Sequence, residues 1–238
     1  MVGFMCFLKL TLYICRVKKL NMKIERRWII SFVIISLISI AALFWPEQTS
    51  LPLPGTFLGE DKIVGADVAW ILASSGLVLL MTPGLSFFYG GMVGKKNMIS
   101  TMLQSFIALG VISIFWVVIG FSLSFGESIG ITINGEHYGI IGNPMSYLFF
   151  NNVGVLPHNK MASTIPFILF ALFQMKFAVI TPALITGSFA ERVRFISYLL
   201  FMVLFSLCIY TPLCHMVWHP DGLLNKYFGV KDFAGGTV

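Results

Sequence analysis

Long apolar runs alternate with short polar segments along most of this chain. A helix that crosses a bilayer needs about 20 mostly apolar residues, because its backbone polar groups must be paired within the segment. Runs that reach or approach this length occupy residues 28–45, 67–89, 99–125, 163–188 and 195–218. A last apolar stretch opens at Phe233. The pattern therefore predicts an all-α integral membrane protein.

The lysine and arginine residues predict how these helices cross the membrane. Seven basic residues precede the first run, and a membrane helix keeps such residues on the cytoplasmic side. Lys95 and Lys96 fall in the next cytoplasmic loop, and Arg192 and Arg194 fall in the one after it. The loops at 46–66 and 126–162 then lie outside. Every loop alternates consistently, which supports a multi-pass protein of a bacterial inner or plasma membrane.

The N-terminal region has two interpretations. Residues 1–27 are basic, and Met22 opens a short basic segment that resembles the start of a signal peptide, so residues before it would be an upstream mis-start. Residues 28–45 are then either a cleaved signal peptide or a signal-anchor helix, followed by an external linker at 46–66. Under both interpretations the helix that begins at Asp67 enters from outside, and residues 67–238 form the membrane domain.

Composition narrows the class of protein. Charged residues make up 11% and hydrophobic residues 57% of the chain, whereas soluble domains are about 25% charged. This excludes an ordinary soluble domain and a disordered chain. The net charge of +6 is concentrated near the N-terminus and in short loops, so we expect a lipid bilayer as partner and no nucleic acid. The four cysteines form no zinc-type spacing, and we expect no metal, cofactor or catalytic residue.

Four strings of residues carry a resemblance to a known family. They are TPGLSFFYGG at 82–91 with KKN at 95–97, FQMKFAVITPALITGSFAER at 173–192, HMVW at 215–218 and DFAGGTV at 232–238. In this order and spacing they resemble the ammonium transporters of the Amt/Mep/Rh group, over residues 67–238.

The resemblance implies a fold, a function and partners. The family fold has eleven transmembrane helices and assembles as a trimer with one pore per subunit. Residues 67–238 would correspond to about four complete helices, so we expect a truncated membrane domain whose pore histidines lie beyond Val238. The implied substrates are ammonium, ammonia and methylammonium. A homotrimer and a PII-type regulatory protein are the implied protein partners.

Phe173 and Phe177 are the first candidate site residues. Four positions apart, they share one helix face and stack one above the other. From the residues alone, two phenylalanines at this spacing are more often lipid or helix contacts. The resemblance instead implies that they stand at the outer mouth of the pore as an apolar gate.

Trp218 and Asp232 are the other candidates. Trp218 ends a helix, where position alone favours an interfacial anchor. The resemblance makes it a wall of the ammonium-binding vestibule, where its ring can attract a cation. Asp232 precedes an apolar run and is typical of a helix N-cap. The resemblance also places its carboxylate beside the recruitment site.

Two further residues have roles left open. Lys176 lies near the middle of a predicted span, where a charge costs at least about 2.5 kcal/mol, so we expect it to pair with protein groups in the bundle or trimer unless it reaches outward. His215 lies three residues before Trp218. We interpret it as a histidine hydrogen-bonded near the helix end rather than a pore histidine.

Other functions remain open alongside transport. The chain would be a membrane ammonium sensor if a signalling domain follows, or a non-functional remnant if none of the missing helices is encoded. A membrane enzyme is disfavoured, because no paired carboxylates, nucleophile–base set or metal cluster falls in the spans. We expect residues 1–238 alone not to conduct.

Overall fold

The computed structural model describes residues 33, 37, 56–233, 235, 237 and 238. The chain divides into two units, Met1–Thr49 and Ser50–Val238. In the first unit only Val33 and Leu37 are described, and both are helical. The expected segment 28–45 otherwise lies outside the described residues, as do 1–27 and 46–55.

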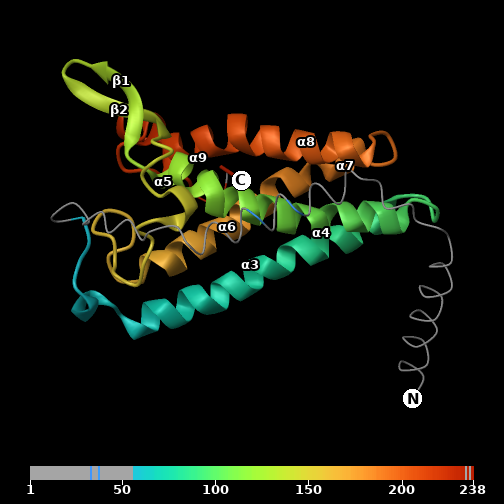
Figure 1. Cartoon of the computed structure of the whole chain (residues 1–238), viewed down its shortest axis with the longest axis horizontal. Helices are drawn as coiled ribbons and strands as arrows, with labels where there is room; N and C mark the ends of the chain where they lie inside the picture. The colour runs from blue at the N-terminus through green and yellow to red at the C-terminus, as the bar shows by residue number, and fades with distance from the viewer. Residues whose placement is uncertain (1–32, 34–36, 38–55, 234, 236) are drawn as a thin grey trace. The chain divides into compact units, whose positions relative to one another are not determined.

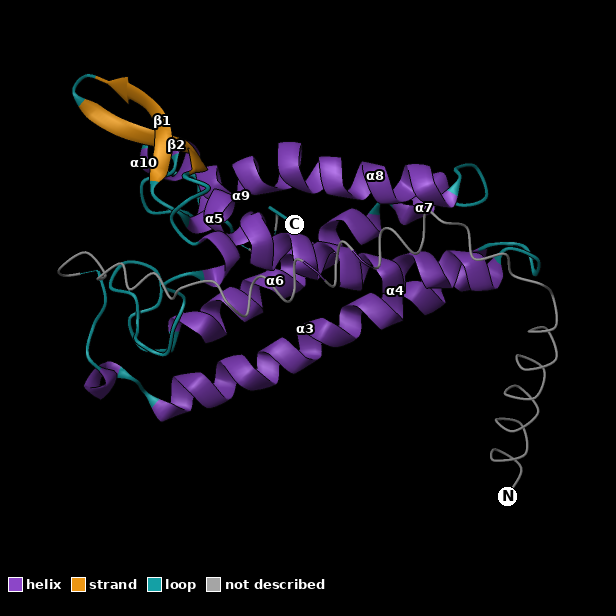
Figure 2. Cartoon of the chain, in the orientation of Figure 1, coloured by secondary structure: helices purple, strands orange, loops and turns teal. Residues whose placement is uncertain are grey.

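The second unit is mainly helical (Figures 1 and 2). Its α-helices are α3 (Gly65–Met92), α4 (Met98–Phe115), α5 (Phe121–Phe125), α6 (Phe167–Leu184), α7 (Thr186–Phe189), α8 (Phe195–Phe205), α9 (Thr211–Trp218) and α10 (Leu223–Lys226). Its other elements are the 3-10 helices η1 (Glu60–Lys62) and η3 (Leu148–Phe150), the π-helical turns η2 (Trp116–Gly120) and η4 (Ser206–Tyr210), and the strands β1 (Ser128–Ile133) and β2 (Glu136–Gly142).

Among the described residues, four helical stretches are long and apolar enough to cross a membrane. They are Gly65–Met92, Met98–Phe125, Phe167–Phe189 and Phe195–Trp218. These confirm the expected helices at 67–89, 99–125, 163–188 and 195–218, except that the third begins at Phe167 rather than at residue 163. Residues 163–166 are not helical, because Pro166 has an extended backbone (φ −55°, ψ 135°) and α6 begins directly after it.

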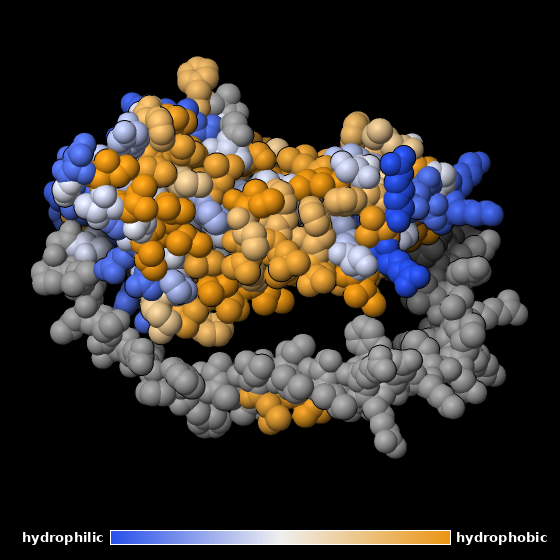
Figure 3. All heavy atoms as spheres, turned by 90° about the horizontal axis from the view of Figure 1, so that it is seen from above, coloured by the Kyte–Doolittle hydropathy of each residue, from blue (hydrophilic) through white to orange (hydrophobic). Residues whose placement is uncertain are grey.

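Consecutive membrane-capable helices run in opposite directions (Figure 1). Helix α3 contacts α4 and α6, and α4 also contacts α6 and α8. Residues 56–64, 126–166 and 219–231 gather at one end, which we call the hairpin end, and residues 93–97 and 190–194 lie at the opposite end (Figure 1). The face shown in Figure 3 is apolar along the middle and polar toward both ends, as a bilayer requires.

At the opposite end, one carboxylate ties the two short loops together. Oε1 of Glu191 accepts hydrogen bonds from the backbone N–H of Gly94 at 2.9 Å and from Nδ2 of Asn97 at 3.0 Å. The bond from Asn97 is the larger cause of a lowered Glu191 pKa. Asn97 of the KKN string and Glu191 of the ER string, which lie far apart in the sequence, are therefore in contact.

The packed core lies toward the hairpin end and is rich in aromatic rings. Trp116, Phe121 and Phe167 are fully buried, and each contacts at least one other ring. The indole N–H of Trp116 donates to the backbone carbonyl of Ala171 at 3.1 Å, which joins η2 to α6. By contrast, α3 exposes many large apolar side chains.

The segment 126–162 contains a β-hairpin that the sequence analysis did not predict. Strands β1 and β2 pair antiparallel, and Asn134 and Gly135 form the two-residue turn with φ of 54° and 83°. Asn-Gly is a strong signal for such a turn because both positions need positive φ. The backbone N–H of Gly139 donates to the carbonyl of Asp221 at 2.7 Å, which fixes the hairpin to the segment after α9.

Candidate functional site

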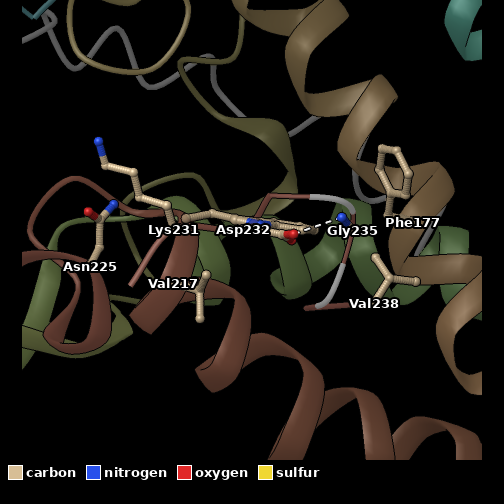
Figure 4. Close-up of a pocket in the computed structure, with 8 residues that line it drawn as sticks. Phe177, Val217, Asn225, Lys231, Asp232, Gly235 and Val238 are labelled. Atoms are coloured by element: carbon tan, nitrogen blue, oxygen red, sulfur yellow. Dashed lines mark hydrogen bonds between the residues drawn. The ribbon is translucent and has the colours of Figure 1, made fainter. Parts of the chain in front are cut away.

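A pocket of about 440 Å³ at the hairpin end contains three of the four candidate residues (Figure 4). It lies between α6, the end of α9, α10 and the last described segment. Its lining consists of Phe177, Val217, Trp218, Asn225, Lys231, Asp232, Gly235 and Val238. The two aromatic rings and the carboxylate therefore come together from positions up to 55 residues apart in sequence.

Trp218 is held on both sides by phenylalanine rings. Its indole stacks on Phe125 with ring centroids 6.5 Å apart and an angle of 14° between the planes. It meets Phe177 nearly edge to face, at 6.3 Å and 69°. Because Phe125 belongs to the buried core, the orientation of the indole is set by packing rather than by solvent. One aromatic wall of the pocket is thus preorganised.

Asp232 connects this wall to the last described segment. Its Oδ2 accepts a hydrogen bond from Trp218 Nε1 at 3.0 Å and another from the Thr237 backbone N–H at 3.2 Å. Its Oδ1 accepts from the Gly235 backbone N–H at 2.7 Å (Figure 4). These three donors are neutral N–H groups, and together they fix the position of the carboxylate.

The expected helix after Asp232 is not observed in the part of this segment that is described. Residues 231–233, 235, 237 and 238 are assigned no helix. The carboxylate accepts the backbone N–H bonds that a helix N-cap would accept, and the N-cap stays a prediction. A turn closed by these bonds satisfies the same donors.

Phe173 lies next to the pocket but does not line it. Its ring meets that of Phe177 edge to face, at 5.1 Å and 84°. This is the contact expected from the four-residue spacing on α6. Phe173 therefore supports the ring of Phe177, which is the member of the pair that reaches the pocket.

A second, smaller pocket of about 140 Å³ also has Trp218 in its wall. Its lining consists of Phe125, Lys160, Met161, Phe170, Gln174, Trp218 and Pro220. The Oε1 atom of Gln174 is buried there and has no hydrogen-bond partner among the described residues. Trp218 is thus a shared wall between two cavities.

Several of these residues were not predicted from the sequence. Asn225 carries no signal of its own, because it reaches the pocket only through the folding of α10, whereas Val217 had one, since it directly precedes Trp218 in the string HMVW. Lys231 had a signal, since it directly precedes Asp232 in the sequence. Phe125, which backs Trp218, lies 93 residues earlier and could not be assigned to the site without the fold.

His215 behaves as a hydrogen-bonded histidine near the helix end, as expected. It is fully buried, its Nδ1 lies 3.0 Å from the Ser124 carbonyl, and its Nε2 lies 3.0 Å from Ser128 Oγ. The same hydroxyl lies 3.2 Å from Nδ1 of His219, whose ring stacks on that of His215. This cluster attaches β1 to α9 and does not line the large pocket.

The pKa of His219 is lowered to about 4, mainly by burial; the neighbouring His215 ring contributes to this shift and Asp221 opposes it. His219 is therefore neutral at physiological pH. In the described part of the chain, no group of three or more His, Cys, Asp or Glu side chains is placed to hold a metal ion.

Lys176 forms no ion pair or hydrogen bond that would link it to another described residue. The ion pairs found among these residues are Lys62–Asp61, Lys160–Asp221 and Lys226–Glu136. The expected partner of Lys176 within the bundle is thus not observed among the described residues.

Comparison with known proteins agrees with the motifs at this site. Residues 69–238 match the Ammonium Transporter Family. An ammonium transporter of Bacillus subtilis is 44% identical over 172 residues, which are 72% of this chain and 39% of the relative. Mep2 of Saccharomyces cerevisiae has a similar structure, with a TM-score of 0.59 and 33% identity over 69% of this chain and 34% of that one.

A structure described as a Sensor Amt Protein is also similar, with a TM-score of 0.58 and 26% identity over 71% of this chain and 39% of that one. The chain spans about two fifths of the length of the curated relatives that it matches. The family match includes all four membrane-capable helices and reaches the last residue of the site. This chain therefore belongs to the Ammonium Transporter Family, as a multi-pass membrane protein.

Proposed function

We propose that the chain takes part in ammonium transport across the cell membrane and that the large pocket recruits the cation. The observation that carries this proposal is the meeting of Trp218, Phe177 and Asp232 in one pocket of about 440 Å³. A small cation that enters the pocket meets two aromatic faces and lies near a fixed carboxylate.

The energetics of the pocket fit a weak recruitment site. A cation over an aromatic ring gains about 0.5–2 kcal/mol, depending on how much water it loses. Several rings together offset part of the lost hydration, while the Asp232 charge adds attraction through the solvated pocket. Rings and charge attract K⁺ as well, so selection for ammonium requires hydrogen-bond acceptors or removal of a proton at a later step.

Phe177, which lines the pocket, would also act as a gate together with Phe173 beside it. Their edge-to-face contact makes a two-ring apolar unit on α6. An apolar constriction resists hydrated ions because they cannot carry water through it. We propose that this unit gates the path that leads inward from the pocket.

The same proposal includes the orientation of the site in the membrane, a second substrate, the assembly and a partner protein. The hairpin end faces outward, because the opposite end carries Lys95, Lys96, Arg192 and Arg194, which favour the cytoplasmic side. Methylammonium is a second substrate, a homotrimer is the working assembly, and a PII-type regulatory protein binds from the cytoplasm. No catalytic step is assigned to any residue.

Uptake of radiolabelled methylammonium tests the transport proposal. The protein is expressed from its native gene in cells that lack their own ammonium transporters. We expect saturable uptake, inhibited by ammonium, and a two- to thirty-fold rise in KM for Trp218→Leu, about the loss of one cation–π contact. Trp70→Leu is the matched control, since Trp70 is 73% exposed on helix α3. Absence of uptake by the unaltered product of the whole native gene would refute transport.

A sensor is the second candidate function, favoured by the similarity to the Sensor Amt Protein. A sensor would bind ammonium in the same pocket but show little flux. Sequencing the native gene past the codon for Val238 tests this: a signalling domain in frame supports a sensor, and further membrane helices alone support a transporter.

A further inference from the structure

The large pocket contains a positively charged side chain in addition to the carboxylate. Lys231 lines the same cavity as Trp218, Phe177 and Asp232, and it is exposed. Figure 4 shows its amino group on the side of the pocket away from Phe177. Its charge therefore stands near the cavity, outside the aromatic wall.

Lys231 differs from the other lysines of the described hairpin end in how its charge is compensated. Lys160 pairs with Asp221 at 3.3 Å, and Lys226 pairs with Glu136 at 3.4 Å. The ion pairs found among the described residues do not include Lys231. Its field is therefore not cancelled by a salt bridge of its own.

The carboxylate of Asp232 is directed toward neutral donors. Its oxygens accept from the indole of Trp218 and from the backbone N–H groups of Gly235 and Thr237. The lining carries one formal negative charge on Asp232 and one positive charge on Lys231, so its net formal charge is zero. The aromatic rings and the Asp232 carboxylate attract a cation, and the positive charge of Lys231 repels it.

We propose that Lys231 weakens the binding of monovalent cations in this pocket and thereby sets the ammonium concentration at which the protein works. The inference rests on the proposed function, and it concerns affinity rather than selectivity, because a lysine repels NH4⁺ and K⁺ equally. The interaction acts across water, so its size is modest and depends on salt.

Substitutions that change only the charge at position 231 test the inference. For Lys231→Met we expect KM for methylammonium to fall about two- to five-fold at low ionic strength, as for a single charge repelling a cation across a solvated pocket. Lys231→Glu should lower KM further, and Lys231→Arg should match the unaltered protein. Lys231→Gln is a second neutral variant in case the methionine variant is poorly expressed.

Lys226→Met is the matched control, since it removes a lysine of the same end that is outside the pocket lining. Its KM should stay unchanged. The effect at position 231 should shrink at about 0.5 M of an inert salt, where charges are screened within a few ångströms, whereas a structural effect would persist.

Two results would overturn the proposal. One is an equal KM for Lys231→Met and the unaltered protein at low ionic strength, and the other is a KM for Lys231→Arg that follows the methionine variant. Either one leaves the transport proposal intact, provided that the unaltered protein takes up methylammonium. If the unaltered protein shows no saturable uptake, the transport proposal and this inference fail together.

Discussion

Trp218 and Asp232 are joined by a hydrogen bond of 3.0 Å from the indole Nε1 to the carboxylate Oδ2. The bond links the end of a membrane-capable helix to a segment 14 residues further on. It holds the edge of the indole while Phe125 supports its face. The aromatic wall of the pocket therefore depends on a carboxylate as well as on packing.

Replacing Asp232 tests this dependence. In Asp232→Ala the indole N–H and the Gly235 and Thr237 N–H groups lose their acceptor, so we expect a loss of about 1–3 kcal/mol in stability and at least a ten-fold loss of methylammonium uptake. Asp232→Asn keeps one acceptor oxygen and should lose less stability. Thermal unfolding in detergent and uptake in cells give the two numbers.

Asp221→Ala is the control for Asp232. Asp221 accepts from Lys160 in an exposed ion pair, which is worth about 1 kcal/mol or less, and it does not line the large pocket. Equal losses of uptake in the two alanine variants would contradict a specific role for Asp232.

Stability should fall as the solution becomes acidic, because His219 is buried in its neutral form. Its pKa is about 4 in the folded protein, against about 6.5 for an exposed histidine. Above pH 6.5 the ring is neutral in both states, and its effect on stability is constant. Between pH 6.5 and 4 only the unfolded state takes up the proton, so this ring removes up to about 1.4 kcal/mol of stability per pH unit.

The melting temperature measured from pH 8 to pH 4 should show this slope. His219→Gln should flatten it in part, since the remaining titratable neighbours His158, His215, Asp221 and Lys160 are unchanged. His137→Gln is the control, because His137 is exposed on β2. A slope unchanged in His219→Gln would show that His219 is not the group responsible.

Gly222 should not tolerate a side chain. A Cβ atom at this position would lie 2.4 Å from the backbone carbonyl oxygens of His215 and Met216, and helix carbonyls cannot move aside as a flexible side chain can. Overpacking of this kind costs about 1–3 kcal/mol, so we expect Gly222→Ala to melt at a lower temperature. A Cβ at Gly154 meets nothing within 4 Å, so Gly154→Ala should melt close to the unaltered protein.

Truncation of two tryptophans should change the stability of the protein to very different extents. Trp116 is completely buried and donates to Ala171, so Trp116→Ala should cost about 3–5 kcal/mol. Trp70 is 73% exposed, so Trp70→Ala should change the melting temperature in detergent little. A similar response in both variants would mean that the core does not pack around Trp116 as described.

Much of the fold could be predicted from hydrophobic run length. The spans near 67–89, 99–125 and 195–218 are confirmed within three residues at each end, because a bilayer-length apolar run leaves the backbone few alternatives to a helix. The start of α6 was misplaced, since apolar character extends across Pro166 while the helix does not. The hairpin at 128–142 was missed because its Asn-Gly turn is a short local signal within a loop.

The sequence by itself determined the membrane helices, the family and three residues of the pocket, since these depend on local composition and on motifs read in order. Only the tertiary structure decided that Phe125 backs Trp218, that Asn225 and Lys231 share the pocket, and that Phe173 stays behind Phe177. Run length and spacing specify where a helix lies along the chain. Which faces meet depends on long-range packing of side chains, which no local pattern encodes.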